Sequence, residues 1–383
     1  MTATASTIPA LGATLGATLA VRDARAADND GLVALASVCP MMGEVAMCVD
    51  RAPDFFALSR LEGERFRVGV AEVGDLVVGC VAASERWAYV DGCVARTAYV
   101  GDLKVHPAYR GGRAADALEE FARAACRGYV GDDGLTLVTV LAGNRAMERR
   151  TSGPRGLPSL VPLATLDVHA VPFLWPRGRH VSGLRVSPAR EEDLDEMGAL
   201  WTRLAPARQL APVLDAERLA AWLGRAPGLA VHDYLVARRA DGRVAGFLAL
   251  WDQRTLKQLR VLAWSPRLAL ARRALNAVAA VAGTARLPAA GGVLPSLAAA
   301  HVCVPAGDPS VLRALLLHAH DERRGAEHLF FTIALDRRDP LARALDGLHA
   351  QPTVVRAYAT APSGRWTGAS LDGRPLHFAS ALV

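Results

Sequence analysis

The sequence predicts an α/β (α+β) protein made of two copies of one module, each a mixed, mostly antiparallel sheet flanked by helices. Three observations support this prediction: an internal repeat, a similar hairpin in each half, and a glycine- and arginine-rich turn between a strand and a helix. The chain has 383 residues, of which 51% are hydrophobic and 21% charged. That length allows two domains, each with its own core.

The internal repeat sets residues 21–28 beside residues 186–193. Val, Ala, Arg and Asp recur at the same places in both segments, and a helical pattern follows each one. Asp28 and Asp193 suit the first turn of that helix, where a carboxylate meets free backbone N–H groups. With the similar hairpins behind it, this match indicates a duplicated module.

Each hairpin joins two apolar segments through a turn that contains Gly and Asp. Strands are expected at residues 67–72 and 76–83, around Gly74-Asp75, and at residues 234–238 and 244–251, around Asp241-Gly242. Tight hairpins require such residues in the turn.

These patterns divide the chain into four parts. We expect a mobile tail at residues 1–16, an N-terminal domain at 17–169, a Pro- and Gly-rich linker at 170–183 and a C-terminal domain at 184–383. Residues 375–383 have the pattern of a final strand.

Composition argues against several functions. The net charge of +6 arises from 44 basic and 38 acidic residues, without a dense basic run that includes aromatic residues, so nucleic-acid binding is not expected. No apolar run is long enough for a membrane span, and the N-terminus lacks the basic region of a signal peptide. Six scattered cysteines without a CxxC pair indicate reduced thiols in a cytoplasmic protein.

No metal site is expected. The pair His318 and His320 invites a metal interpretation, but residues two apart on a helix point to different faces.

The segment that suggests chemistry is residues 97–127. An apolar strand ends at His106-Pro107, because Pro cannot donate to a sheet ladder. A turn with Gly111 and Gly112 follows, and a helix is expected from Ala114 to Arg127.

Such a strand, turn and helix can bind a pyrophosphate. The start of a helix offers unpaired N–H groups and the positive end of a dipole. Glycine lets the backbone approach phosphate oxygens closely, and Arg110 and Arg113 add positive charge. The alternative is an ordinary turn with surface arginines.

This segment resembles the signature of the GNAT superfamily of N-acyltransferases, which is an apolar strand, a Pro, then Arg or Gln followed by x-x-Gly-x-Gly/Ala at a helix start. The resemblance implies an acetyl-CoA site made of Leu103, Lys104, Val105, Arg110, Gly111, Gly112, Arg113, Ala114 and Ala115. Arg113 stands where the family has its middle Gly, so its side chain would either crowd the pyrophosphate or bind it. Asn144, after an expected strand at 135–141, is placed near the pantetheine arm.

The resemblance also implies an N-acetyltransferase, in which an amine attacks the thioester of acetyl-CoA directly. Asp102 is the catalytic candidate that relays the amine proton; the alternative for Asp102 is a structural salt bridge. The Tyr that often protonates the leaving thiolate is replaced by Thr151 and Ser152. A non-catalytic acyl-CoA-binding or regulatory protein is therefore the second hypothesis, and an interaction scaffold without a ligand is the third.

The second half resembles plant hookless-like probable N-acetyltransferases at residues 247–251, 317–320 and 339–341. Its turn at residues 305–309 has one Gly, no Arg, and Asp308, which would repel pyrophosphate, so this module is expected to bind acetyl-CoA weakly or not at all. Arg254, Lys257 and Arg260 form a polar stretch that faces either an acidic acceptor or solvent. The sequence identifies neither the acceptor amine nor the oligomeric state.

Overall fold

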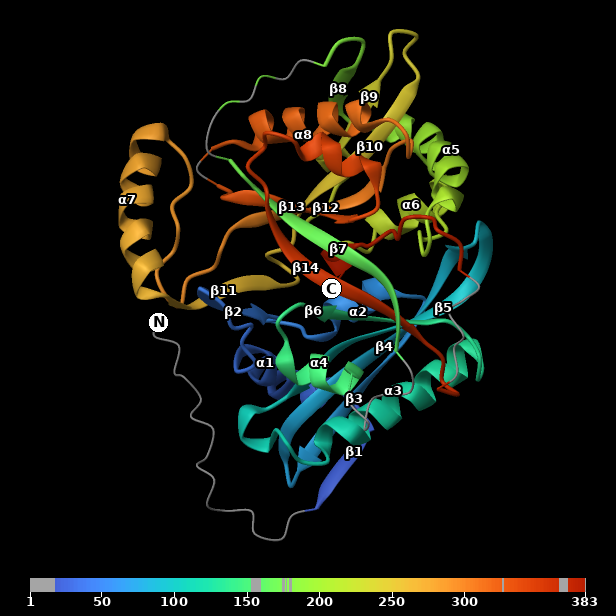
Figure 1. Cartoon of the computed structure of the whole chain (residues 1–383), viewed down its shortest axis with the longest axis vertical. Helices are drawn as coiled ribbons and strands as arrows, with labels where there is room; N and C mark the ends of the chain where they lie inside the picture. The colour runs from blue at the N-terminus through green and yellow to red at the C-terminus, as the bar shows by residue number, and fades with distance from the viewer. Residues whose placement is uncertain are drawn as a thin grey trace.

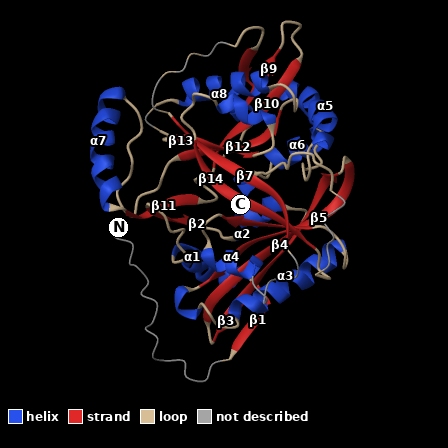
Figure 2. Ribbon diagram, viewed as in Figure 1, coloured by secondary structure: helices blue, strands red, loops and turns tan. Residues whose placement is uncertain are grey.

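A single twelve-stranded sheet runs through both halves of the chain, with helices on its faces (Figures 1 and 2). The computed structural model describes residues 18–152, 160–173, 176, 178, 181–325, 327–364 and 371–382. The strand order is β1-β3-β4-β5-β6-β14-β7-β13-β12-β10-β9-β8. The predicted fold class is confirmed. The predicted tail at residues 1–16 lies outside the described residues.

Within its described residues, the first half contributes six strands to this sheet and four helices. The strands are β1 (Leu19–Asp23), β3 (Arg65–Val73), β4 (Leu76–Val90), β5 (Cys93–Val105), β6 (Thr136–Leu141) and β7 (Val161–Pro172). The helices are α1 (Asn29–Ser37), α2 (Phe56–Glu62), α3 (Ala114–Val130) and α4 (Arg145–Ser152).

The part of the second half that the structure describes contributes the other six strands and four further helices. The strands are β8 (Arg185–Pro188), β9 (Tyr234–Arg238), β10 (Val244–Asp252), β12 (Ser296–Cys303), β13 (Phe330–Asp336) and β14 (Gln351–Thr360). The helices are α5 (Leu194–Leu204), α6 (Ala216–Leu223), α7 (Pro266–Ala282) and α8 (Pro309–Arg323). The predicted hairpins are present as β3–β4 and β9–β10.

The repeated segment has the same local structure in both halves. A short strand, β1 or β8, leads into a 3₁₀ turn that ends at Asp28 or Asp193. The Arg25 N–H donates to Asp28 Oδ2 at 2.6 Å, and the Arg190 N–H donates to Asp193 Oδ2 at 2.9 Å. Each carboxylate therefore satisfies a backbone donor at the start of its helix.

The two halves exchange strands at the middle of the sheet. β14, from the end of the chain, pairs with β6 on one side and β7 on the other. β7 in turn pairs with β13 of the second half. The green β7 and the red β14 run together through the centre of Figure 1. Each half therefore has a strand of the other within its own sheet.

The domain boundaries remain a prediction. Residues 170–172 of the expected linker are the last residues of β7, and residues 174–175, 177 and 179–180 of that linker lie outside the described residues.

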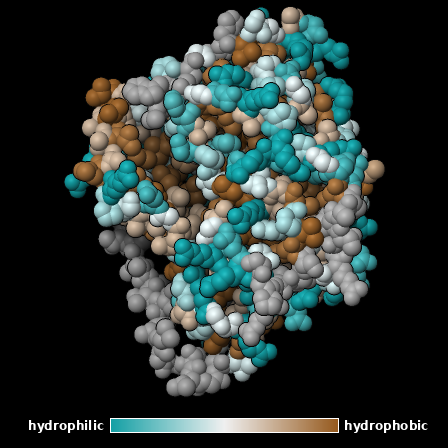
Figure 3. All heavy atoms as spheres, viewed as in Figure 1, coloured by the Kyte–Doolittle hydropathy of each residue, from teal (hydrophilic) through white to brown (hydrophobic). Residues whose placement is uncertain are grey.

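A second link between the halves lies outside the large sheet. β2 (Val45–Asp50) pairs with β11 (Gln258–Trp264) to form a two-stranded sheet. An ion pair between Arg260 of β11 and Asp50 of β2, 2.7 Å long, also joins the two strands. α7 follows β11 at the edge of the molecule, where Leu270 and Val281 are 71% and 92% exposed and brown atoms are visible (Figure 3).

One small hydrophobic cluster joins the halves beneath the exchanged strands. It contains Tyr99 of β5 and Leu137 of β6 with Leu166 of β7, Ala357 of β14 and Leu376. These five side chains are all at least nine-tenths buried. Burial of apolar surface thus holds the exchanged strands in place in addition to the ladder hydrogen bonds.

The prediction of a final strand at residues 375–383 is wrong for the described part of that segment. Leu376 makes an isolated bridge to Gln209, and residues Ser380–Leu382 form a 3₁₀ turn. The Leu376 N–H donates to the Asp336 carboxylate at 2.8 Å rather than to a neighbouring strand. Val383 lies outside the described residues.

We predict that Leu166→Ala, which truncates a fully buried side chain of β7, lowers the free energy of unfolding by about 3 kcal/mol. Because both halves share β7 and β14, calorimetry should still show a single unfolding transition. Leu270→Ala, at an exposed position on α7, is the matched control and should change stability by less than about 0.5 kcal/mol. Two separate transitions in the wild-type chain would contradict a shared sheet.

Candidate functional site

The parallel strands β5 and β6 separate within the first half. Their ladder covers only Ala98 to Val100 on β5 and Thr136 to Val138 on β6, although both strands continue further. The register between β4 and β5 shifts just beyond this point, between Cys80 and Ala82. Such a bulge bends a strand, so β5 turns away from β6 and leaves a wedge between them.

Asp102 lies at this bulge in a left-handed conformation with φ +52°. Its carboxylate accepts a hydrogen bond from Arg51 Nη1 at 2.8 Å and another from Lys104. Burial raises the pKa of Asp102, but the Lys104 ammonium and the Arg51 guanidinium lower it much more, so it lies well below the usual range. Asp102 is therefore ionised at neutral pH and held by two cations.

The helix after the wedge has an uncapped start. Among the described residues, no hydrogen bond uses the N–H groups of residues 111–116; the first bond of this turn runs from the Ala117 N–H to the Arg113 carbonyl. Gly111 has φ +83°, which a residue with a Cβ rarely adopts. The exposed Arg113 side chain makes no capping hydrogen bond. Unpaired amides at the start of a helix are the feature that binds anions in other proteins.

The remaining predicted cofactor residues surround this helix start. Leu103, Lys104 and Val105 form the end of β5, and Arg110 Nε donates to the Val105 carbonyl at 3.1 Å. Gly112, Arg113, Ala114 and Ala115 continue from the turn into α3. Arg150 of α4 pairs with Asp116 at 2.6 Å, which offsets the acidic residue nearest the anion site.

Asn144 lies at the far side of the wedge, after β6. Its side-chain Oδ1 accepts a hydrogen bond from the Met147 N–H at 3.3 Å, so it caps α4. The structure therefore places every predicted cofactor residue at the end of β5, the start of α3 or the turn after β6.

A second group of polar side chains covers the opposite face of β4 and β5. Ser84 and Tyr99 are paired across the two strands, and the Arg86 guanidinium lies 4.1 Å from the Tyr99 ring. The other face of these strands packs against α3 through Ala83 and Ala98. Because side chains alternate along a strand, the helix that starts at the anion site and this polar group lie on opposite faces of the sheet.

Glu62 reaches this polar group from the last turn of α2. It is 8% exposed, and among the described residues no hydrogen bond or ion pair reaches its carboxylate. Burial, first of all, raises the pKa of Glu62 to about 7; the nearby Arg86 and Arg51 oppose the rise and Asp102 adds to it. The sequence analysis missed Glu62, because nothing in the apolar α2 pattern distinguishes it from a surface residue.

Lys257 comes to the same region from the second half. Burial lowers its pKa to about 7, with Arg51 adding to the effect, and its Nζ donates to the Ser380 carbonyl at 3.4 Å. The other two basic residues of that polar stretch have acidic partners elsewhere: Arg254 pairs with Asp252 and Arg260 with Asp50. Of the three residues, only Lys257 therefore lies beside the polar group; Arg254 and Arg260 are held by acidic partners elsewhere.

Four other residues of β4, β5 and the turn between them could act as acids or bases, but their surroundings differ from that of Asp102. The Tyr99 hydroxyl is 3.0 Å from Thr139 Oγ1 inside the wedge, and burial raises its pKa. Tyr89 packs in the core of the second half. Glu85 pairs with Arg65 on the α3 face, and Asp91 lies at the β4–β5 turn, where Gln209 bonds it.

The second half has an equivalent wedge, between β12 and β13. Their ladder ends at Ala298 and Thr332, and His301 has φ +48° beside a register shift, as Asp102 does in the first half. Here, however, the segment with Leu376 and Phe378 crosses the opening and leaves a cavity of only about 20 Å³.

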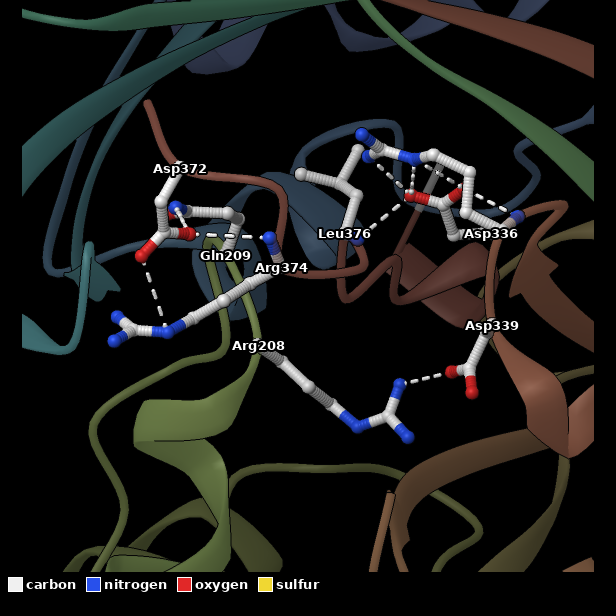
Figure 4. Close-up of polar contacts among 8 residues, drawn as sticks. Arg208, Gln209, Asp336, Asp339, Asp372, Arg374 and Leu376 are labelled. Atoms are coloured by element: carbon white, nitrogen blue, oxygen red, sulfur yellow. Dashed lines mark hydrogen bonds and ion pairs between the residues drawn. The ribbon is translucent and has the colours of Figure 1, made fainter. Parts of the chain in front are cut away.

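Polar contacts fasten that segment in place (Figure 4). Asp336 accepts from the Leu376 N–H, and Gln209 Nε2 donates to Asp372 at 2.8 Å. The neighbouring Arg208–Asp339 pair links two other parts of the second half. The start of α8 is also closed, since Asp308 accepts from the Ser310 N–H and Pro309 has no N–H to offer. The second wedge is thus filled by the chain itself.

The described residues contain neither a metal-binding cluster nor a helix that could span a membrane. No cluster of three or more His, Cys, Asp or Glu side chains could hold a metal ion there. Within the same residues, every helix is too short or too polar to cross a membrane.

Comparison with known proteins agrees with this geometry. Residues 39–149 match the model of the family described as Acetyltransferase (GNAT) family. The fold is that of the GNAT acyltransferases. No curated protein is similar enough in sequence to count as a match.

Solved structures share the GNAT fold over most of the chain. N-myristoyltransferase from Saccharomyces cerevisiae, solved with bound myristoyl-CoA, is 13% identical with a TM-score of 0.61, over 96% of this chain and 88% of that one. A GCN5-related N-acetyltransferase from Sphaerobacter thermophilus is 12% identical with a TM-score of 0.54, over 90% and 96%. A probable N-acyltransferase from Enterococcus faecalis is 11% identical with a TM-score of 0.51, over 91% and 73%.

We predict that Arg51→Met lowers the free energy of unfolding by about 3 kcal/mol, because the buried Asp102 carboxylate loses one of its two cations. Denaturant titration measures the change, and Arg51→Met combined with Asp102→Asn should recover part of it. Arg60→Met breaks an exposed ion pair with Asp54 and is the control, with a cost below about 1 kcal/mol. If Arg51→Met and Arg60→Met lower the free energy of unfolding equally, the Arg51–Asp102 pair does not hold the bulge.

Proposed function

We propose that the protein is an N-acyltransferase that moves an acetyl group from acetyl-CoA to an amine. The observation that supports this proposal is the set of unpaired N–H groups at residues 111–116, beside the open end of β5. Such amides suit the pyrophosphate of a coenzyme, and the wedge would give the pantetheine arm a path between the strands. Both features occur in the half that matches the GNAT family.

In the proposed reaction, the coenzyme diphosphate binds at the start of α3 with Arg110 and Arg113 beside it. The backbone of Leu103 to Val105 lines the thioester end, where its N–H groups stabilise the oxyanion that forms. Asn144 lies next to the arm, across the wedge. The acceptor amine approaches from the opposite face of the sheet and attacks the carbonyl carbon directly.

Asp102 keeps its proposed catalytic role in this site, as an ionised group at the bend of β5. Because Lys104 and Arg51 keep it deprotonated, it sets the local field and orients both cations next to the reacting carbonyl. That Asp102 also relays the amine proton stays a prediction from the sequence.

The alternative is a non-catalytic acyl-CoA-binding or regulatory protein. The Tyr expected near Thr151 is missing, and the Tyr99 hydroxyl is already engaged with Thr139. Release of free thiol from acetyl-CoA in the presence of an amine panel supports the transferase. Binding of acetyl-CoA without turnover of any amine supports the alternative, and no thermal shift with CoA at all supports a scaffold without a ligand.

Three further assignments belong to this proposal. We propose acetyl as the acyl group, to be tested by comparing acetyl-CoA with longer acyl-CoA thioesters. The resemblance of the second half to plant hookless-like proteins stays a prediction, as does the cytoplasmic location. The cysteines of the described residues, all free thiols, are compatible with that location.

We predict that Arg110→Glu weakens CoA binding at least 100-fold, because it replaces a cation with a carboxylate beside the diphosphate. Isothermal titration with CoA measures the change. Arg127→Glu, at the other end of α3, is the matched control and should bind CoA as the parent does. An Arg110→Glu variant that binds with the parent affinity would place the cofactor elsewhere.

We also predict that Asp102→Asn lowers kcat about 10-fold or more while leaving the Kd of CoA within a factor of about 3. The physical reason is that Asp102 lies beside the reacting carbonyl, away from the diphosphate site at the start of α3. Steady-state kinetics and titration on the same preparation separate the two effects. Unchanged turnover at neutral pH would remove Asp102 from the mechanism.

A further inference from the structure

The polar group on the face of β4 and β5 opposite α3 contains several buried atoms without partners. Among the described residues, Ser59 Oγ, Ser84 Oγ, Arg51 Nε and both Nε and Nη2 of Arg86 are buried and make no hydrogen bond. Ser59, Ser84 and Arg51 are each at most 1% exposed. Buried polar atoms are nearly always paired, so a cluster of unpaired ones indicates a site whose ligand supplies the partners.

Glu62 belongs to the same cluster. Ser59 and Glu62 are three residues apart on α2 and so share one face of that helix. The backbone of Gly63, the next residue, lies against Ser84 and Glu85 of β4, which brings the end of α2 onto this face. We call Ser59, Glu62, Ser84 and Arg86 the α2 pocket.

The cluster faces the reacting centre proposed above. Ser84 is paired with Tyr99 of β5, and Tyr99 is three residues before Asp102 at the bulge. Tyr99, Asp102, Arg51, Arg86 and Lys257 are the charged or titratable groups near Glu62. α3 packs on the other face of these strands, so the α2 pocket and the helix start proposed for the coenzyme lie on opposite sides of the sheet.

We propose that the α2 pocket binds the acceptor and that Glu62 is the base that takes the proton from its ammonium group. This inference rests on the proposed N-acyltransferase function. Arg86 offers its two unpaired nitrogens, Nε and Nη2, as donors to an oxygen of the acceptor, so the acceptor class is an amine that carries a carboxylate or another oxygen acceptor close to its nitrogen.

In the proposed transfer, one proton of the ammonium group goes to Glu62 and a second goes to the thiolate. The ammonium N–H bond breaks and its proton bonds to a Glu62 carboxylate oxygen, which frees the nitrogen lone pair. That pair forms the C–N bond to the thioester carbonyl carbon, and the C–S bond breaks with its electrons on sulfur. The second proton of the nitrogen goes to the thiolate, which gives the amide and free CoA, and Glu62 returns its proton to solvent.

The surroundings of Glu62 suit this task. Burial disfavours its charged form, which places its pKa near 7, while Arg86 and Arg51 keep a deprotonated fraction available. General bases with pKa values close to the working pH are the most efficient. A carboxylate whose pKa is as low as that of Asp102 is a much weaker base.

The test compares Glu62→Gln with the wild-type chain in acetyl transfer, with kcat/KM measured from pH 5 to 10. We expect Glu62→Gln to lose about 10²- to 10⁴-fold in kcat/KM at pH 7, while CoA binds with unchanged affinity. The wild-type profile should rise through about pH 7 as Glu62 deprotonates. The variant should lack that step and follow the ionisation of the free amine at higher pH.

Two further variants test whether the loss of activity is specific to the α2 pocket. Glu64→Gln changes an exposed neighbour that accepts a bond from Trp87 Nε1, and it should keep the wild-type profile. Arg86→Met should raise KM about 10-fold or more for amino acids but much less for simple alkylamines.

The outcomes distinguish the two proposals. If the wild-type chain transfers no acetyl group to any amine, the proposed function fails and this inference fails with it. If the wild type is active and Glu62→Gln matches it across the pH range, the inference alone is wrong. A loss of activity in Glu62→Gln that keeps the pH step near 7 would likewise overturn the assignment of the base.

Discussion

The bend of β5 at Asp102 is the constraint on which the rest of the structure depends. A left-handed conformation at a residue with a side chain is unfavourable by about 1 kcal/mol or more, so it persists only where the surroundings hold it. Arg51 and Lys104 supply that hold through buried charge-assisted hydrogen bonds. Because β5 bends there, its ladder with β6 stops at Val100, and the sheet opens beside the helix start whose amides are unpaired. The two cations that hold this bend also set the charge beside the wedge.

In the second half, the equivalent opening between β12 and β13 is filled. His301 repeats the backbone conformation of Asp102, and β12 leaves β13 in the same way. His301 donates to or accepts from Tyr234 at 2.6 Å and packs against Trp222, and burial lowers its pKa to about 4, so it is a neutral core residue. Leu376 and Phe378 then fill the opening. The half that keeps its wedge open has ion pairs at the bend, and the half that is filled has an aromatic cluster there.

Sequence patterns predicted much of this fold, for reasons that are local. The Gly/Asp turns, the apolar strands, the carboxylates of Asp28 and Asp193 at helix starts and the glycine-rich turn at Gly111 follow from short-range chemistry, and the structure has all of them. The exchange of β7 and β14 could not be predicted, since strand order depends on contacts between residues about 190 apart, such as Arg356 with Thr165. Glu62 was missed for the same reason. The groups around it come from β4, β5 and Lys257, which are not its neighbours along the helix.

The most direct test is a crystal structure with acetyl-CoA bound. We expect the diphosphate oxygens to lie about 3 Å from N–H groups of residues 111–116, with the pantetheine arm between β5 and β6. The thioester should then lie beside Leu103 to Val105, on the path from the α2 pocket. A diphosphate bound away from the start of α3, or an Arg113 side chain folded across those amides in its place, would contradict the account.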